Sequence, residues 1–217
     1  MKKIFFISGL GANELAFSKV GNVDFEKVMI KWIPCDKKED LESYALRLID
    51  GYKIKDNDIV VGLSFGGLLA QKISNITGQR NVILISSFRD KNDLRFPFRQ
   101  ALYAGLQKLF LPIRVPWVDE LVANMLNSGT SDSKSVLKEM LKITDYRLMK
   151  WSLQQIATTN GLLNKDVVLY NIIGDRDRIV RLWKNDTTFL IKGGSHFMVY
   201  DRSEEVTKII RHIVSSE

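Results

Sequence analysis

The stretch VGLSFGGLLA, Val61–Ala70, places one serine between two glycines and a third glycine directly after them. Ordered glycine loses more conformational entropy than any other residue, so three of them in one turn need a structural reason. The apolar residues DIVV before this turn are typical of a buried strand, and the run GGLLAQKI after it is typical of a helix. Ser64 therefore lies on a predicted strand-to-helix turn, which is either an ordinary turn or the strained turn that presents a nucleophile.

Residues 62–66 have the G-x-S-x-G form of a nucleophile elbow. In such a turn the residues two before and two after the serine approach so closely that a Cβ on either one would clash. This requirement explains glycine at positions 62 and 66. Gly67 would let the following helix lie close against neighbouring strands.

The composition is that of one ordinary globular domain: 217 residues, 45% hydrophobic and 26% charged. The net charge of +7 is spread along the chain rather than gathered in a block, so we expect a solvated basic surface and no nucleic-acid partner. The single cysteine, Cys35, cannot form an internal disulfide and fits a reducing, cytoplasmic location. No run approaches the ~18 apolar residues of a transmembrane segment, and the short run Ile4–Leu10 predicts a buried strand rather than a secretion signal.

Short β-rich runs alternate with amphipathic stretches along the chain. The six predicted strands are Ile4–Ser8, Val28–Ile33, Asp58–Ser64, Asn81–Ser87, Val167–Ile173 and Thr187–Gly193. Several are continuously apolar, as expected for parallel strands that are covered on both faces. Residues 40–49 and 206–214 have the apolar spacing of helices. The sequence therefore predicts an α/β protein with a doubly wound, mainly parallel sheet of about six strands.

One interval interrupts this alternation. From Phe88 to about Asn160 no strand is evident, helical patterns recur, and three of the four prolines occur. Because about 70 helical residues are too many for a simple crossover, we expect a helical cap inserted after the fourth strand. It would cover the carboxyl ends of the strands, where open α/β sheets bind ligands. The predicted division is a core of 1–87 and 161–217 with a cap of 88–160.

A serine hydroxyl needs a base to become a nucleophile, and the chain has only two histidines. His212 lies off the apolar stripe of the C-terminal helix, so we interpret it as a surface residue. His196, in GGSHFMVYD, follows the last predicted strand at the edge where a ligand is expected. It is either the base or a loop histidine bonded to backbone.

A catalytic histidine also needs a carboxylate to hold its tautomer. The segment GDRDRIV after the fifth strand offers Asp175 and Asp177, and Asp90 after the fourth strand is a third candidate. The same segment could also be a solvated turn. For an oxyanion hole we expect two N–H donors, those of Phe65 and of Leu10 in the loop SGLGAN.

These motifs resemble the α/β-hydrolase family over nearly the whole chain. GLSFGG is similar to the family's nucleophile elbow, and the order of serine, acid and histidine is the one that the family uses. GDRDRIV is similar to the family pattern of Gly, two residues, the acid, two residues, Val and Pro, which makes Asp177 the acid. Three features depart from the family: Ser8 where many members have histidine, Arg181 where proline is usual, and the absence of the first two strands of larger members.

The resemblance implies acyl chemistry without a metal or cofactor. Ser64 would attack an ester or thioester of a small acyl substrate, as in small capped carboxylesterases. His196 would act as the base, and Asp177 would be the carboxylate that holds the histidine. Alternatives are C–C bond hydrolysis, acyl transfer or small-peptide cleavage with the same three residues, or a ligand-binding protein of hydrolase fold with negligible turnover.

The first part of the predicted cap, 88–115, combines large apolar residues with six cationic residues and two aspartates. One interpretation is an apolar acyl pocket with a basic rim for an acidic group, such as an acidic acyl carrier. The other is a lid helix whose apolar stripe covers the sheet while its charges face water.

Overall fold

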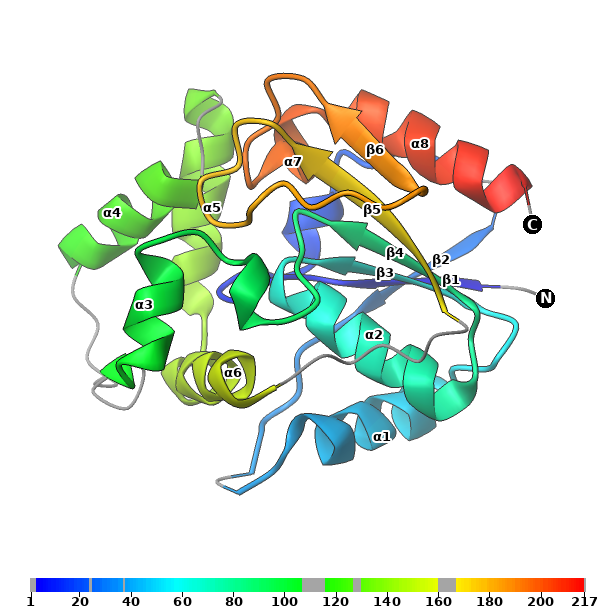
Figure 1. The fold of residues 1–217 in the computed structure, drawn as a ribbon, viewed down its shortest axis with the longest axis horizontal. Helices are drawn as coiled ribbons and strands as arrows, with labels where there is room; N and C mark the ends of the chain where they lie inside the picture. Colours follow the sequence, from blue (N-terminus) through cyan, green and yellow to red (C-terminus); the bar gives the residue numbers. More distant parts are fainter. Residues whose placement is uncertain are drawn as a thin grey trace.

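The computed structural model describes residues 3–23, 25–36, 38–106, 116–126, 130–159 and 167–216. Within these ranges one sheet of six parallel strands has the order β2-β1-β3-β4-β5-β6 (Figure 1). The strands are β1 Lys3–Ile7, β2 Glu26–Ile30, β3 Ile59–Leu63, β4 Asn81–Ile85, β5 Val168–Gly174 and β6 Thr188–Ile191. The predicted doubly wound, parallel sheet is confirmed.

Helices cover both faces of this sheet (Figure 1). On one face lie α1 (Leu41–Tyr52) and α2 (Phe65–Thr77), and on the other lie α7 (Met198–Asp201), α8 (Ser203–Ser215) and the 3-10 helix η1 (Glu14–Phe17). Alternate residues of each strand point to opposite faces, so a strand between two helix layers must be apolar throughout. This is the physical reason for the continuous apolar runs of the sequence.

A helical insertion follows β4, as predicted. It contains the 3-10 helix η2 (Lys91–Asp93), α3 (Phe98–Tyr103), α4 (Pro116–Leu126), α5 (Ser131–Ile143) and α6 (Tyr146–Thr158). Figure 1 shows these helices gathered at the carboxyl ends of the central strands. The division at 88 and 160 stays a prediction, and Asn160 and residues 107–115 lie outside the described residues.

One strand ends earlier than predicted. The sequence suggested a strand over 28–33, but β2 ends at Ile30. The main chain beyond it bonds to tyrosine hydroxyls of α1: Tyr52 accepts from the N–H of Lys31 at 2.8 Å, and Tyr44 accepts from Ile33 N at 3.0 Å and donates to Ile33 O at 2.8 Å. Backbone groups that bond to a helix cannot also pair with β1, so Trp32 lies in a loop.

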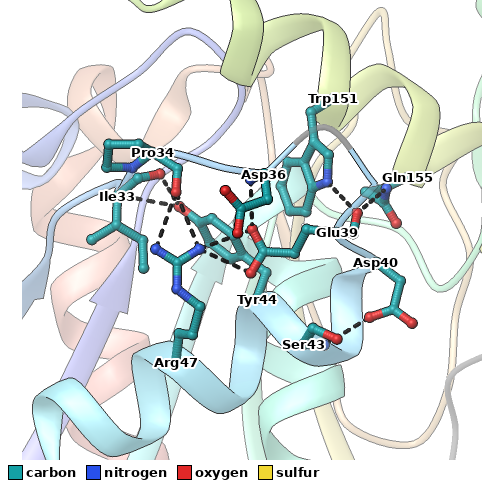
Figure 2. A network of polar contacts seen from close by, with 10 residues as sticks. All are labelled: Ile33, Pro34, Asp36, Glu39, Asp40, Ser43, Tyr44, Arg47, Trp151 and Gln155. Carbon is teal, nitrogen blue, oxygen red and sulfur yellow. Dashed lines mark hydrogen bonds and ion pairs between the residues drawn. The ribbon is translucent and has the colours of Figure 1, made fainter.

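The loop between β2 and α1 also joins the insertion to the core (Figure 2). The Arg47 guanidinium donates to both carboxylate oxygens of Glu39 at 2.9 Å and to the carbonyl of Pro34 at 3.2 Å. From α6, the indole of Trp151 donates to the Glu39 carbonyl at 2.7 Å, and Gln155 donates to the same oxygen at 3.4 Å. The insertion is thereby fixed to the rim of the sheet.

Inside the insertion, Glu120 of α4 forms ion pairs with Lys134, at 2.6 Å, and with Lys138, both on α5. These hydrogen bonds lower the pKa of Glu120 to about 2. Among the helices described, none is both long and apolar enough to cross a bilayer.

Candidate active site

Ser64 lies at the sharp turn between β3 and α2, with φ 51° and ψ −119°. A positive φ is strained for a residue with a Cβ, and the surroundings hold it. Its N–H donates to Ile85 O at 3.0 Å, and its carbonyl accepts from Ser87 Oγ at 2.7 Å and from Gly67 N at 2.9 Å. The strained turn predicted from the sequence is therefore present.

The glycines around Ser64 are required by close backbone packing. A Cβ on Gly62 would overlap the main chain of Gly66 and Gly67, as the elbow pattern predicts. A Cβ on Gly66 would overlap the carbonyl oxygens of Ile7 and Ser8 at the end of β1, so this second glycine makes room for a neighbouring strand. Gly67 similarly lets α2 lie against the loop after β4.

His196 follows β6 and lies between Ser64 and Asp177. Its Nε2 is 3.0 Å from Ser64 Oγ, and its Nδ1 is 2.9 Å from Asp177 Oδ2 and 3.1 Å from Oδ1. The imidazole is 6% exposed and the carboxylate is fully buried. Because an ionised carboxylate only accepts, Nδ1 carries the proton of a neutral ring and Nε2 is left to accept from the serine hydroxyl.

The Asp177 carboxylate is itself held by backbone. Oδ1 accepts hydrogen bonds from the N–H groups of Ile179, at 2.8 Å, and Val180, at 2.9 Å. Oδ2 is the oxygen nearer to His196. His196 Nδ1 is near both oxygens, but the two backbone N–H groups bind Oδ1, which fixes the rotation of the carboxylate about its own axis.

The other candidates from the sequence lie elsewhere. Asp175 accepts from Gly193 N at 2.6 Å, and Asp90 caps η2 by accepting from Asn92 N at 2.6 Å. His212 is exposed on α8, with its ring edge-to-face against Phe189. The structure therefore brings together Ser64, Asp177 and His196 and keeps these other groups apart from them.

The loops that carry Asp177 and His196 are bonded to each other. Arg176 N donates to Gly194 O at 3.0 Å, beside the bond from Gly193 N to Asp175. A Cβ on Gly174 would overlap the carbonyl of Gly194, so glycine permits this close approach. Asp175 thus contributes to the packing of the two loops rather than contacting the imidazole.

The predicted oxyanion donors flank Ser64. Phe65 is the first residue of α2, and Leu10 lies in a turn closed by a hydrogen bond from Ala12 N to Gly9 O at 3.1 Å. A Cβ on Gly9 would lie 3.1 Å from Ser64 Cβ, so this turn runs directly beside the serine. Within the described ranges, neither the N–H of Leu10 nor that of Phe65 donates to another residue. Both N–H groups are free to bind an oxygen of a ligand.

A cavity of about 370 Å³ lies between the loops after β1 and β2 and the turn from α5 to α6. Leu10, Trp32, Met140, Leu148 and Met149 supply apolar surface, and Lys31, Glu14 and Asp145 supply charge. One of the two sequence interpretations made 88–115 the wall of an acyl pocket. None of residues 88–106 lines this cavity, and 107–115 lie outside the described residues. Sequence reasoning missed the α5–α6 wall, whose only signal was the helical pattern itself.

Cys35 is half-buried in the loop after β2, and desolvation raises the pKa of its thiol. The protonated thiol is a poor nucleophile at neutral pH. In the described part of the chain, no group of three or more His, Cys, Asp or Glu side chains is arranged to hold a metal ion.

The sequence matches no protein-family model and no curated protein. Solved structures are similar over the full length. A hydrolase from Oleispira antarctica superimposes with a TM-score of 0.78 at 14% identity, over 100% of this chain and 92% of that one. A thermophilic esterase from Thermogutta terrifontis gives 0.76 at 13% identity over 100% and 90%, and an esterase from Rhodococcus sp. ECU1013 gives 0.73 at 12% over 99% and 90%. With its six-stranded parallel sheet and its helical insertion after β4, this chain has the α/β-hydrolase fold.

Proposed function

We propose that the protein is a serine hydrolase that cleaves a carboxylic ester or thioester of a small acyl substrate. The observation that carries the proposal is the continuous set of hydrogen bonds from Ser64 Oγ through His196 to Asp177. A serine hydroxyl is a weak nucleophile until an adjacent base accepts its proton, and the imidazole is within reach to do so.

In the acylation step, Ser64 Oγ attacks the carbonyl carbon while His196 Nε2 takes the hydroxyl proton. The N–H groups of Leu10 and Phe65 stabilise the resulting oxyanion. The bond to the leaving alcohol or thiol then breaks, and His196 returns its proton to that group. Asp177 stays ionised and stabilises the imidazolium.

Water completes the reaction. It attacks the acyl-enzyme carbonyl and gives a proton to His196, and the bond to Ser64 Oγ breaks as the serine recovers that proton. The products are the carboxylic acid and the alcohol or thiol, so the balance needs only substrate and water. The helices of the insertion lie at the carboxyl edge of the sheet, where they would limit entry of other solvent.

A small ester fits the surroundings better than an acidic carrier protein. The cavity beside Leu10 is mainly apolar and in the size range of small-ligand pockets. Three cations of the insertion already have partners in the chain: Arg89 binds Asp93 at 2.8 Å, Lys91 donates to Ala157 O at 2.9 Å, and Arg95 donates to Val180 O at 3.2 Å. The similar structures include esterases, which supports an ester as the bond that is cleaved.

A fluorophosphonate probe tests this proposal directly, because it reacts with a serine only where a base activates the hydroxyl. We expect the native chain to be labelled, Ser64→Ala to be unlabelled, and Ser135→Ala, an exposed serine on α5, to be labelled as the native chain is. A folded native chain that is neither labelled nor active on esters contradicts the proposal and supports a ligand-binding protein.

A second series identifies the bond. p-Nitrophenyl esters of increasing acyl length, compared with thioesters of the same acyl groups, give kcat/KM for each. The cavity has Leu10 in common with the site, although Ser64 and His196 do not line it, and it is small, so we expect short acyl chains to be preferred.

A further inference from the structure

The indole of Trp32 closes the two ends of the loop that carries Leu10. Its Nε1–H is shared between Ser8 Oγ, at 2.8 Å, and Ala12 O, at 3.0 Å. The Ser8 hydroxyl donates its own proton to Ala12 O, also at 3.0 Å. One N–H, one hydroxyl and one carbonyl therefore form a closed set of hydrogen bonds across the loop. We call this set the loop clamp.

The loop clamp encloses a tight turn. Residues 9–12 make the turn closed by Ala12 N and Gly9 O, with Gly11 at φ +73°. A positive φ at the third residue is the requirement of a type II turn, which glycine meets without strain. The Leu10 N–H is left out of the turn's own bond, so its direction depends on how the two ends of the loop are held.

The same indole also contacts the other oxyanion donor. The Trp32 ring stacks on the Phe65 ring with centroids 5.7 Å apart and planes inclined by 16°. Phe65 is fully buried at the first position of α2. Trp32 thus touches both segments that present a free N–H beside Ser64, although the two segments follow different strands.

We propose that Trp32 and Ser8 are positioning residues, which fix the N–H groups of Leu10 and Phe65 relative to each other for the transition state. This inference rests on the proposed function. An oxyanion hole works only when its donors are already aimed at the developing charge, since reorienting them during the reaction offsets the stabilisation. The turn after β1 and the start of α2 are not covalently adjacent, and the indole is the side chain that joins them.

Two substitutions break the loop clamp from opposite sides. Trp32→Phe keeps an aromatic ring against Phe65 but removes the N–H, and Ser8→Ala removes the hydroxyl. Ser8 is 2% exposed and does not line the cavity beside Leu10, so its removal leaves the lining of that cavity unchanged. Loss of one oxyanion donor lowers kcat by about 10²–10³-fold. Because the donors are displaced here rather than lost, we expect kcat to fall about tenfold in each variant. KM is compared in Ser8→Ala, where it should stay within about twofold, because Trp32 also lines the cavity.

Two further readouts distinguish positioning from general damage. The two effects on kcat should be non-additive in the double variant, because Trp32 and Ser8 bond to each other and to the same Ala12 carbonyl. A thionoester replaces the carbonyl oxygen by sulfur, which accepts hydrogen bonds weakly, so its hydrolysis depends less on the oxyanion donors. The ratio of ester to thionoester rates should therefore fall about tenfold in both single variants, whereas damage elsewhere would slow both substrates equally.

Trp151→Phe is the matched control. Trp151 also contacts Phe65, edge-to-face at 6.0 Å, and donates a hydrogen bond to Glu39 O, but among the described residues it makes no hydrogen bond to the loop of residues 8–12. Its ester to thionoester ratio should equal the native ratio. Thermal unfolding checks that each variant is folded. If Trp32→Phe does not fold, Ser8→Ala, the smaller change, tests the positioning role by itself.

An unchanged ratio in the clamp variants, or an equal fall in the control variant, overturns the positioning role while labelling of native Ser64 still upholds the hydrolase. A native chain that is neither labelled nor active overturns both proposals.

Discussion

Exchange of Asp177 for asparagine turns one carboxylate oxygen into an NH2 group, and the structure determines where that group must point. Oδ1 accepts from two backbone N–H groups, those of Ile179 and Val180, at 2.8 and 2.9 Å. An NH2 group in that place would face two donors without any acceptor, so the amide oxygen must occupy it. The NH2 group then takes the place of Oδ2, which lies 2.9 Å from His196 Nδ1.

This orientation selects the wrong tautomer of the imidazole. The nearer group facing Nδ1 is then a donor, at 2.9 Å against 3.1 Å for the amide oxygen, which favours the tautomer with the ring proton on Nε2. A protonated Nε2 cannot accept the hydrogen of Ser64 Oγ, 3.0 Å away, although every heavy atom keeps its position. Loss of the correct tautomer lowers kcat by about 10⁴-fold, equivalent to about 5.4 kcal/mol in the activation free energy.

Steady-state hydrolysis of a p-nitrophenyl ester measures this loss, and thermal unfolding confirms that the fold is kept. Asp175→Asn is the matched control, because within the described residues the Asp175 carboxylate accepts from Gly193 N and makes no hydrogen bond to His196. We expect the control to lose less than about fivefold in kcat. Retention of more than a tenth of the native kcat by Asp177→Asn, or a larger loss in the control, refutes the assignment of Asp177.

Three other outcomes follow from the geometry. His196→Ala should abolish ester turnover while His212→Ala leaves kcat/KM within about twofold, and the reverse result would reassign the base. In urea unfolding, Gly66→Ala should lower the free energy of unfolding by about 3 kcal/mol, because its Cβ would overlap carbonyl groups at the end of β1. Gly51→Ala, at an open site of α1, should raise it by about 0.5–1 kcal/mol. Equal effects of the two substitutions would contradict this reasoning. The lowered pKa of Glu120 means that its ion pairs stabilise the fold above pH 4.5 and progressively less as pH falls toward 2. The difference in Tm between the native protein and Glu120→Gln should therefore shrink from pH 7 to pH 3. A constant difference would refute the pairing.

The sequence predicted the features that are determined locally. Strands covered on both faces must be apolar throughout, and an elbow leaves no space for Cβ atoms at Gly62 and Gly66. The strands and the elbow could therefore both be predicted from the sequence. The doubly wound, parallel sheet followed from the alternation of strands and helices. Only the fold-family resemblance favoured Asp177 over Asp175; in the structure the distances to His196 separate them.

What the sequence could not predict depends on distant partners. Aromatic and β-branched residues made 28–33 read as a strand, but hydroxyls of Tyr44 and Tyr52 bind the main chain after Ile30 and end it. Trp32 was therefore assigned to the sheet, and its bond to Ser8 could not be foreseen. The α5–α6 wall of the cavity was likewise not predicted, because nothing in the sequence shows which helices of the insertion turn toward the loop after β1.

The loops around Ser64 are held by one another and by the insertion. The turn after β1 lies against Ser64 itself, and the loops after β5 and β6 bond to each other beside His196. The residue after the histidine, Phe197, donates its N–H to the carbonyl of Leu126 in α4 at 3.2 Å, and Tyr200 donates to Asp132 of α5 at 3.0 Å. The insertion is thus bonded to the loop that carries the proposed base. Because its helices brace that loop and also line the cavity, a substitution on the cavity side of α5 has to be judged by kcat as well as by KM.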